Sequence, residues 1–214
     1  MSIASYQTIP IQENNEPLVD LSSFDFILDP IYFNRGFTTN QRMFLRVGVA
    51  KKLQEIQKDL KIYKFKIWDG FRPREVQNTL YKSTWEEFKL KHPEWDENKL
   101  AIEVGTFVTP PHEPGRIPPH ATGGAVDLTL VDQVGKELDM GTDFDYFGPE
   151  ASPLYFEENA INETVRKNRK IFREAMLAIG FMQYPEEWWH FDYGDQLWAM
   201  KSGAPLAIYG EIKL

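Results

Sequence analysis

Two segments that lie far apart in the chain each carry polar side chains within an otherwise apolar, strand-like sequence. The first is His120-Ala-Thr-Gly-Gly-Ala-Val-Asp127, and the second is Glu187-Trp-Trp-His190. The adjacent glycines of the first segment allow a tight backbone turn, so that His120 and Asp127 can converge. If the two segments meet, they offer two imidazoles and one aspartate to a single metal ion, and Glu187 is left over. This meeting constrains the fold more than any other feature of the sequence.

Three protein ligands with an open fourth position are typical of a catalytic zinc site, and histidine and aspartate suit zinc. The pattern therefore predicts one Zn²⁺ per chain, held by His120, Asp127 and His190. A carboxylate that is not a ligand, here Glu187, can accept a proton from a metal-bound water. Alternatively, a lone histidine is often a core residue, and the second segment also fits an aromatic core strand with polar ends. Positions three apart face opposite sides of a strand, so Glu187 and His190 can share a metal only if the strand is bulged or begins between them.

The composition narrows the class of protein. A chain of 214 residues with 42% hydrophobic and 14% aromatic residues can form one domain with a substantial core. The net charge of −8 argues against nucleic acid and anionic membranes as partners, because no basic surplus is present to neutralise phosphates. Without cysteine there is neither a disulfide nor a thiolate zinc site. The N-terminus has no basic start and no apolar run, which favours a cytoplasmic protein.

Periodicity predicts an α+β fold with a central antiparallel sheet, flanked by helices and carrying the zinc site. Residues 1–17 are expected to be an irregular lead-in, and residues 18–214 a single domain with a loop insertion at about 92–119. Helices are expected from Thr38 or Thr39 to about Leu60, from Pro73 to about Leu90, and over about Glu163–Ile179. Strands are expected over Lys61–Trp68, Ala125–Leu130 and Phe181–Tyr193, with a hairpin near Gln133–Lys136 and one short strand near Ala101–Val108 in the loop. On the strand that begins at Ala125, Asp127 is expected on the polar face.

Two further polar groups are candidates for a site. Arg72 follows a strand end at a turn, where a guanidinium can stabilise a developing oxyanion; it can equally be a surface arginine paired with a carboxylate. The segment Asp139-Met-Gly-Thr-Asp-Phe-Asp145 clusters three carboxylates, whose spacing does not match a calcium-binding loop. It is either an acidic turn or a site that pairs with a substrate ammonium group.

Together these motifs resemble the zinc D-alanyl-D-alanine dipeptidases of the vancomycin-resistance type. The likeness runs in order over about residues 18–200: Leu18-Val-Asp-Leu21, Trp68-Asp-Gly-Phe-Arg72-Pro, the first metal segment, the acidic segment and Glu187-Trp-Trp-His190. Pro118 and Pro119 stand where the family often has serines, one of which is thought to hold the substrate carboxylate. A tyrosine expected soon after Leu21 to help bind the ammonium is replaced by Ser22-Ser-Phe24.

The resemblance implies the compact α+β zinc fold shared with lysostaphin-type and hedgehog proteins, with His120, Asp127 and His190 as zinc ligands. It implies that Glu187 is the general base and then the acid, and that Arg72 stabilises the tetrahedral intermediate. Asp145 would bind the free ammonium of a small D-amino-acid dipeptide; no oligomeric state is predicted. The rival hypotheses are a D,D- or L,D-carboxypeptidase acting on peptidoglycan stem peptides, and a zinc-stabilised binding module without turnover. If loop 92–119 roofs the pocket, dipeptides are favoured; an open groove would admit longer peptides.

Overall fold

The computed structural model describes residues 3–213, and its centre is a five-stranded sheet with the order β2-β4-β5-β7-β6. A separate two-stranded sheet pairs β1 with β3. The strands are β1 (Leu18–Asp20), β2 (Ile27–Leu28), β3 (Phe44–Arg46), β4 (Lys64–Asp69), β5 (Ala125–Val131), β6 (Met182–Gln183) and β7 (His190–Asp192). Every pair in the large sheet is antiparallel except β2 with β4, which is parallel. The predicted α+β class is confirmed, and the sheet is antiparallel apart from this edge strand.

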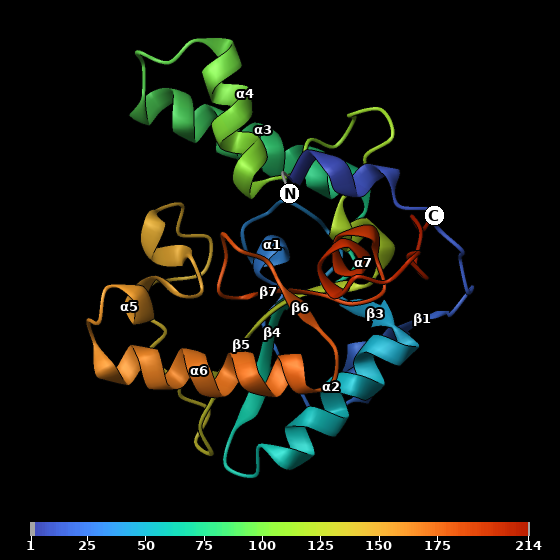
Figure 1. Cartoon of the computed structure of the whole chain (residues 1–214), viewed down its shortest axis with the longest axis vertical. Coiled ribbons are helices and arrows are strands. Elements are labelled where there is room, and N and C mark those ends of the chain that lie inside the picture. The colour runs from blue at the N-terminus through green and yellow to red at the C-terminus, as the bar shows by residue number, and fades with distance from the viewer. Residues whose placement is uncertain (1–2, 214) are drawn as a thin grey trace.

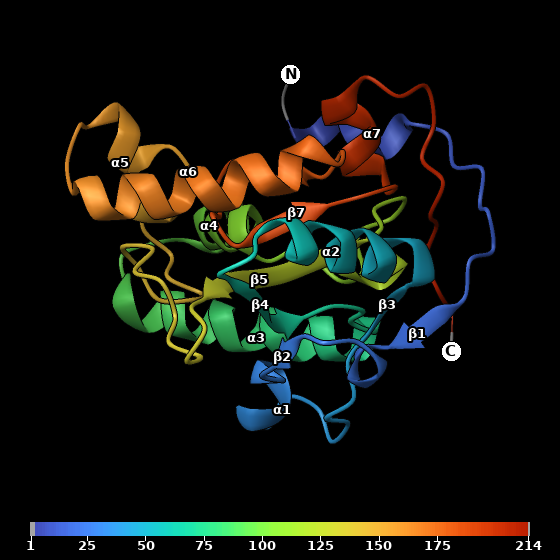
Figure 2. The ribbon, with the colours of Figure 1, turned by 90° about the horizontal axis from the view of Figure 1, so that it is seen from below.

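Helices cover both faces of the large sheet. They are α1 (Ile31–Asn34), α2 (Val47–Asp59), α3 (Arg74–Lys91), α4 (Glu97–Phe107), α5 (Tyr155–Glu158), α6 (Glu163–Ala178) and α7 (Gln196–Ser202). Short 3₁₀ helices cover Ile3–Thr8, Leu21–Ser23, Pro119–Thr122 and Pro149–Ala151. Figures 1 and 2 show α2 and α6 on one side of the sheet, and α3 and α4 on the other.

The main core lies between the sheet and the layer of α2 and α6. Leu53, Leu128 and Phe172 belong to it, and each is at most 1% exposed. Because α3 and α4 lie on the opposite side, all seven residues of β5 are buried. The expectation of a polar face around Asp127 is therefore wrong: both faces of this strand are covered, and Asp127 is a buried charge.

The expected helix start at Thr38 or Thr39 is wrong. The Thr38 side chain accepts a hydrogen bond from the Asn40 backbone within a local turn, and the chain then forms β3 before α2 begins at Val47. Strand β3 pairs in register with β1, from Leu18 opposite Arg46 onward. That partner is distant in the sequence, so local periodicity did not reveal the strand.

The segment 92–119 is more ordered than expected. The strand predicted near residues 101–108 is helix α4, and Asp96 caps it by accepting from the Lys99 backbone at 2.8 Å. Leu100 and Val104 pack with Phe88 of α3 in a second apolar cluster. The expected irregular lead-in likewise contains a 3₁₀ helix.

The single strand expected over Phe181–Tyr193 is wrong: the segment forms two short strands, β6 and β7, which pair antiparallel across a turn. Both later helices and the hairpin are confirmed. Helix α3 follows Pro73, and α6 begins at Glu163 and ends just before Gly180, which has a φ of 91°. The hairpin after β5 closes with a bond from the Asp132 backbone N–H to the Lys136 carbonyl at 2.9 Å. Within residues 3–213, no helix combines the length and apolar character needed to cross a membrane. The location expected from the sequence stays a prediction.

Candidate active site

The two polar segments meet at the centre of the large sheet. Strands β5 and β7 pair so that Asp127 lies directly opposite His190. His120 lies in the 3₁₀ helix that precedes β5. This helix ends at Gly123, whose φ of 71° lies in the left-handed region. A Cβ added to Gly124 would lie 2.4 Å from the Tyr193 backbone oxygen, so this close approach needs glycine. The expectation that the two segments converge is confirmed.

The three predicted ligands form a compact triangle of donor atoms. His120 Nε2 lies 3.2 Å from His190 Nδ1 and 3.3 Å from Asp127 Oδ2, and His190 Nδ1 lies 3.0 Å from Asp127 Oδ1. In a tetrahedral zinc site with bonds of about 2.0–2.1 Å, ligand atoms lie about 3.3 Å apart. The imidazole nitrogens and the Asp127 oxygens have comparable spacings, so these residues could hold a metal ion.

The second ring nitrogen of each histidine has an acceptor. His120 Nδ1 lies 2.8 Å from the Gly70 carbonyl oxygen, and His190 Nε2 lies 2.8 Å from Asp192 Oδ1. When a metal ion is bound, each outer nitrogen would carry the ring proton, which leaves His120 Nε2 and His190 Nδ1, 3.2 Å apart, to bind the ion.

Buried charges surround this triangle. Burial alone would raise the pKa of the Asp127 carboxyl, but His120 and His190 together hold it well below its usual range. Burial raises the pKa of Glu187 well above its usual range, and the neighbouring His190 only partly opposes this. The Asp127 carboxyl is thus held as an anion, whereas the Glu187 carboxyl binds a proton readily.

Glu187 precedes β7 in a turn, and the strand begins at His190 itself. Glu187 Oε2 lies 3.9 Å from His190 Nδ1, so both side chains face the same space. The predicted requirement for a strand start between them is confirmed. The two intervening rings have different surroundings: Trp188 packs against Phe172 in the core, and Trp189 lines the cavity.

Arg72 is not a surface residue. Its guanidinium is 6% exposed and is fixed on several sides. It donates to Asp69 Oδ2 at 2.7 Å and to Gln77 Oε1 at 2.9 Å, and it lies 3.3 Å from Asp127 Oδ2. Its face lies over the Tyr32 ring, 4.5 Å from the centroid. This cation is held rigidly beside the predicted metal ligands.

Of the three clustered aspartates, Asp145 lines the cavity, whereas Asp139 and Asp143 line a separate surface hollow. Asp145 has a φ of 60° and pairs with Arg35, and the Tyr32 hydroxyl lies 3.4 Å from its Oδ1. Burial raises the pKa of Asp145 to about 6, although Arg35 opposes the shift.

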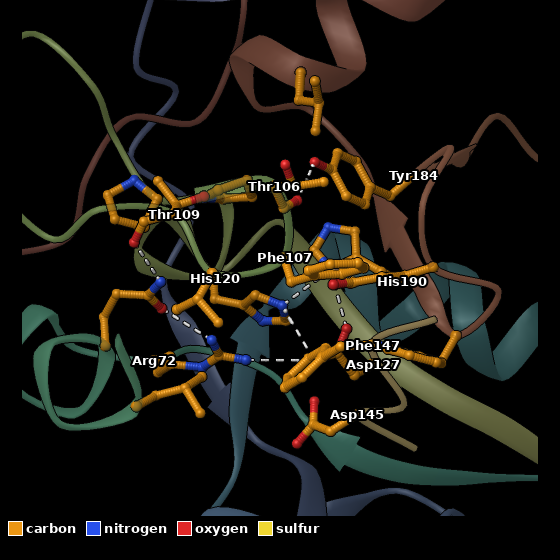
Figure 3. Close-up of a pocket in the computed structure, with 18 of the residues that line it drawn as sticks. Arg72, Thr106, Phe107, Thr109, His120, Asp127, Asp145, Phe147, Tyr184 and His190 are labelled. Carbon is orange, nitrogen blue, oxygen red and sulfur yellow. Dashed lines mark hydrogen bonds and ion pairs between the residues drawn. The ribbon is translucent and has the colours of Figure 1, made fainter. Parts of the chain in front are cut away.

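A cavity of about 50 Å³ connects these groups. Figure 3 shows His120, His190 and Asp127 at its centre, with Arg72 to one side and Asp145 below. Its roof comes from the end of α4 and the following segment, through Thr106, Phe107, Val108, Thr109, Arg116 and Pro118. The C-terminal part of the segment 92–119 therefore roofs the site.

The sequence left several cavity residues unassigned, together with Asp192, which contacts His190 from outside the cavity lining. Asp192 had a usable signal, because residues two apart on a strand share a face and His190 is a predicted ligand. Tyr32, Gln77 and Tyr184 carried no local signal, since each enters the cavity from an element that packs there only in the tertiary fold. The sequence has no tyrosine at the expected position soon after Leu21, but the Tyr32 hydroxyl lies 3.4 Å from Asp145 Oδ1.

Comparison with known proteins agrees with the motifs. A family model described as D-Ala-D-Ala dipeptidase matches residues 34–204. A D-alanyl-D-alanine dipeptidase of Synechocystis sp. is 29% identical over 97% of this chain and 96% of its own length. Its namesake in Enterococcus faecalis is 27% identical over 75% of this chain and 78% of its own.

Among solved structures, VanYB in complex with D-alanine-D-alanine has a TM-score of 0.44 at 18% identity, covering 93% of each chain. The vancomycin-resistance D,D-dipeptidase VanXYg has a TM-score of 0.43 at 20% identity, covering 91% of this chain and 66% of its own. The family model alone spans most of the chain, including every predicted site residue. This chain belongs to the D-Ala-D-Ala dipeptidase family of peptidases.

Proposed function

We propose that this protein is a zinc-dependent dipeptidase that hydrolyses D-Ala-D-Ala or a closely related D,D-dipeptide. The observation that carries the proposal is the convergence of three ligand-type atoms, a spare carboxylate and a fixed guanidinium on one roofed cavity. His120, Asp127 and His190 would hold the zinc. When bound, zinc supplies a water with a pKa of about 7 and polarises the substrate carbonyl.

Glu187 is the proton carrier in this proposal. It accepts the proton of the attacking water and returns it to the amino group that leaves when the peptide bond breaks. Its burial supports this role, because a carboxyl with a raised pKa binds the transferred proton more tightly than an exposed one does. Trp189 excludes bulk water from the same wall of the cavity.

Arg72 donates to the carbonyl oxygen as that oxygen gains negative charge. Since Asp69 and Gln77 already fix the guanidinium, little reorganisation is needed during the reaction. Asp145 binds the substrate ammonium as an anion within the cavity. The Tyr32 hydroxyl, between Asp145 and Arg72, links these two roles.

The roof favours dipeptides over stem peptides. Residues 106–109, Arg116, Pro118 and Pro119 close over the cavity, and its small volume of about 50 Å³ favours a compact substrate over a long peptide. A substrate with the D-alanyl chemistry of peptidoglycan precursors fits the family. A binding module without turnover has no use for Glu187 and Arg72, whose burial is costly unless each charge serves a purpose.

The test compares three substrates with the zinc-loaded protein: D-Ala-D-Ala, L-Ala-D-Ala and a stem pentapeptide. Released alanine is measured over time, and protein stripped of metal serves as the control. We expect D-Ala-D-Ala to be hydrolysed fastest and the pentapeptide slowest. Preferential trimming of the pentapeptide would favour the carboxypeptidase, and no release from any substrate would contradict a peptidase.

A further inference from the structure

Charged groups of opposite sign line the cavity. Asp145 lies on one side, beside Tyr32 and Arg35. Arg116 lines the cavity together with Tyr6 and Tyr184. In Figure 3, Tyr184 and Asp145 lie on opposite sides of the His120 and His190 rings. The cavity therefore holds an anion beside Tyr32 and a cation beside Tyr6.

A free dipeptide is a zwitterion, so its carboxylate needs strong donors once it leaves water. Most donors of the cavity are already engaged. The Gln77 amide donates to the Thr109 carbonyl at 2.8 Å, and the Tyr184 hydroxyl donates to the Thr106 carbonyl at 2.8 Å. Arg72 contacts Asp69, Gln77, Tyr32 and Asp127, and in the proposed function it donates to the substrate carbonyl oxygen. The substrate carboxylate therefore needs a further donor.

Arg116 can supply this donor. Its side chain is 14% exposed; Nε donates to the Tyr6 hydroxyl at 2.8 Å, and Nη1 donates to Glu113 Oε2 at 2.9 Å. A guanidinium carries five N–H groups, and no described residue accepts from its Nη2. The Tyr6 oxygen accepts from Arg116, which leaves its own proton free to be donated. Pro118 and Pro119 on the same wall offer neither a side-chain donor nor a backbone N–H.

Building on the proposed function, we propose that Arg116, with the Tyr6 hydroxyl, binds the C-terminal carboxylate of the dipeptide. Asp145 binds the ammonium at the other end, so the two charges bracket the peptide bond beside His120 and His190. A bidentate guanidinium–carboxylate contact fixes orientation as well as charge. The enzyme is then selective for a free C-terminal carboxylate over an amide of the same shape.

The experiment compares D-Ala-D-Ala with its C-terminal amide, D-Ala-D-alaninamide, in the full-length zinc-loaded protein. We expect the wild type to prefer the acid. Arg116→Gln should lower kcat/KM for the acid by about 10- to 100-fold, mainly through KM, because charge-assisted bonds are lost in ground and transition state alike. Cleavage of the amide should change little, and Arg116→Lys should restore part of the preference.

Glu113→Gln is the matched control, because it removes the ion pair with Arg116 and leaves the guanidinium in place. It should keep the preference for the acid. Equal loss of preference in this control would assign the effect to roof packing and overturn the proposal. A wild type that cleaves acid and amide equally well also overturns it, whether or not any variant folds. A wild type that cleaves neither contradicts the proposed function itself.

Discussion

The carboxylate of Asp192 is the group behind His190 whose replacement tests most directly how the site holds a metal ion. Asp192 is fully buried, and its Oδ1 accepts from His190 Nε2 at 2.8 Å. Its other oxygen has no hydrogen bond, and Lys201 Nζ lies 3.6 Å away. Asp192→Asn keeps the shape of the side chain and removes its charge. We expect the variant to fold and to bind zinc more weakly.

The structure indicates how the asparagine amide would sit. With its oxygen toward Lys201 and its nitrogen toward His190, it avoids placing an N–H beside the ammonium. The amide then donates to His190 Nε2, which forces the ring proton onto Nδ1, the nitrogen that faces the metal site. The loss of an outer partner of a metal-bound histidine costs about 10- to 100-fold in affinity. Because this orientation also reverses the tautomer, we expect about 100-fold, equivalent to about 2.7 kcal/mol.

Zinc affinity is measured by competition with a chromophoric chelator, alongside the metal content of the purified protein. Asp195→Asn is the control: Asp195 is also buried, and burial followed by the Asp192 charge raises its pKa to about 8. It is therefore mostly neutral at pH 7, and asparagine can still accept from the Trp198 backbone as the cap of α7. Equal zinc affinity in Asp192→Asn and the wild type would refute the argument that Asp192 orients His190.

Three further outcomes are expected. Glu187→Ala should keep zinc and lose nearly all turnover, whereas His120→Ala should lose both. Metal content and alanine release measure the two effects, and near wild-type hydrolysis by Glu187→Ala would mean that the base is misassigned. Asp145 should lose its negative charge as pH falls through about 6, so the KM of the wild type should rise below that pH. The KM of Asp145→Asn should stay nearly constant over the same range, and parallel pH profiles of the two proteins would exclude this carboxyl as the ammonium site. Gly124→Ala places a Cβ 2.4 Å from a backbone oxygen and should lower Tm by about 3–10 °C, from about 1–3 kcal/mol of overpacking. Gly105→Ala in α4, with its nearest neighbour at 3.9 Å, should leave Tm unchanged or raise it, and equal Tm values for the two variants would contradict the packing argument.

The ligand triangle was predictable because each half of it is encoded locally. His120 and Asp127 are joined by a glycine turn, and His190 opens a strand that starts after a proline. Pairing of β5 with β7 then brings the halves together without further specification, since Asp127 and His190 are direct partners across the sheet. Long amphipathic helices such as α6 were predictable for the same local reason.

The roof and the outer contacts were not predictable from local pattern. In helix α4 only Leu100 and Val104 are buried, and both pack with Phe88 of α3, which is distant from them in the sequence pattern. Strand β3 exists because β1 is there to pair with it. Tyr32 belongs to a helix of four residues that no periodicity could have revealed. In each case the deciding partner is distant in sequence.

The distribution of buried charge supports a functional origin for the centre of this fold. Within the described residues, Arg46 and Arg169 are buried elsewhere, and the other buried charged side chains lie in or near the cavity: Asp69, Arg72, His120, Asp127, Glu187, His190, Asp192 and Asp195. Burying a charge costs free energy that even a good partner often fails to return, and apolar residues of similar volume commonly serve stability as well or better. Of this group, Asp192 and Asp195 each retain an oxygen without a hydrogen bond, so the cluster is not optimised for stability. Its retention between two covered faces of a sheet is explained when these charges bind a cation and move a proton, because neither task can be done by the apolar side chains that stability alone would favour.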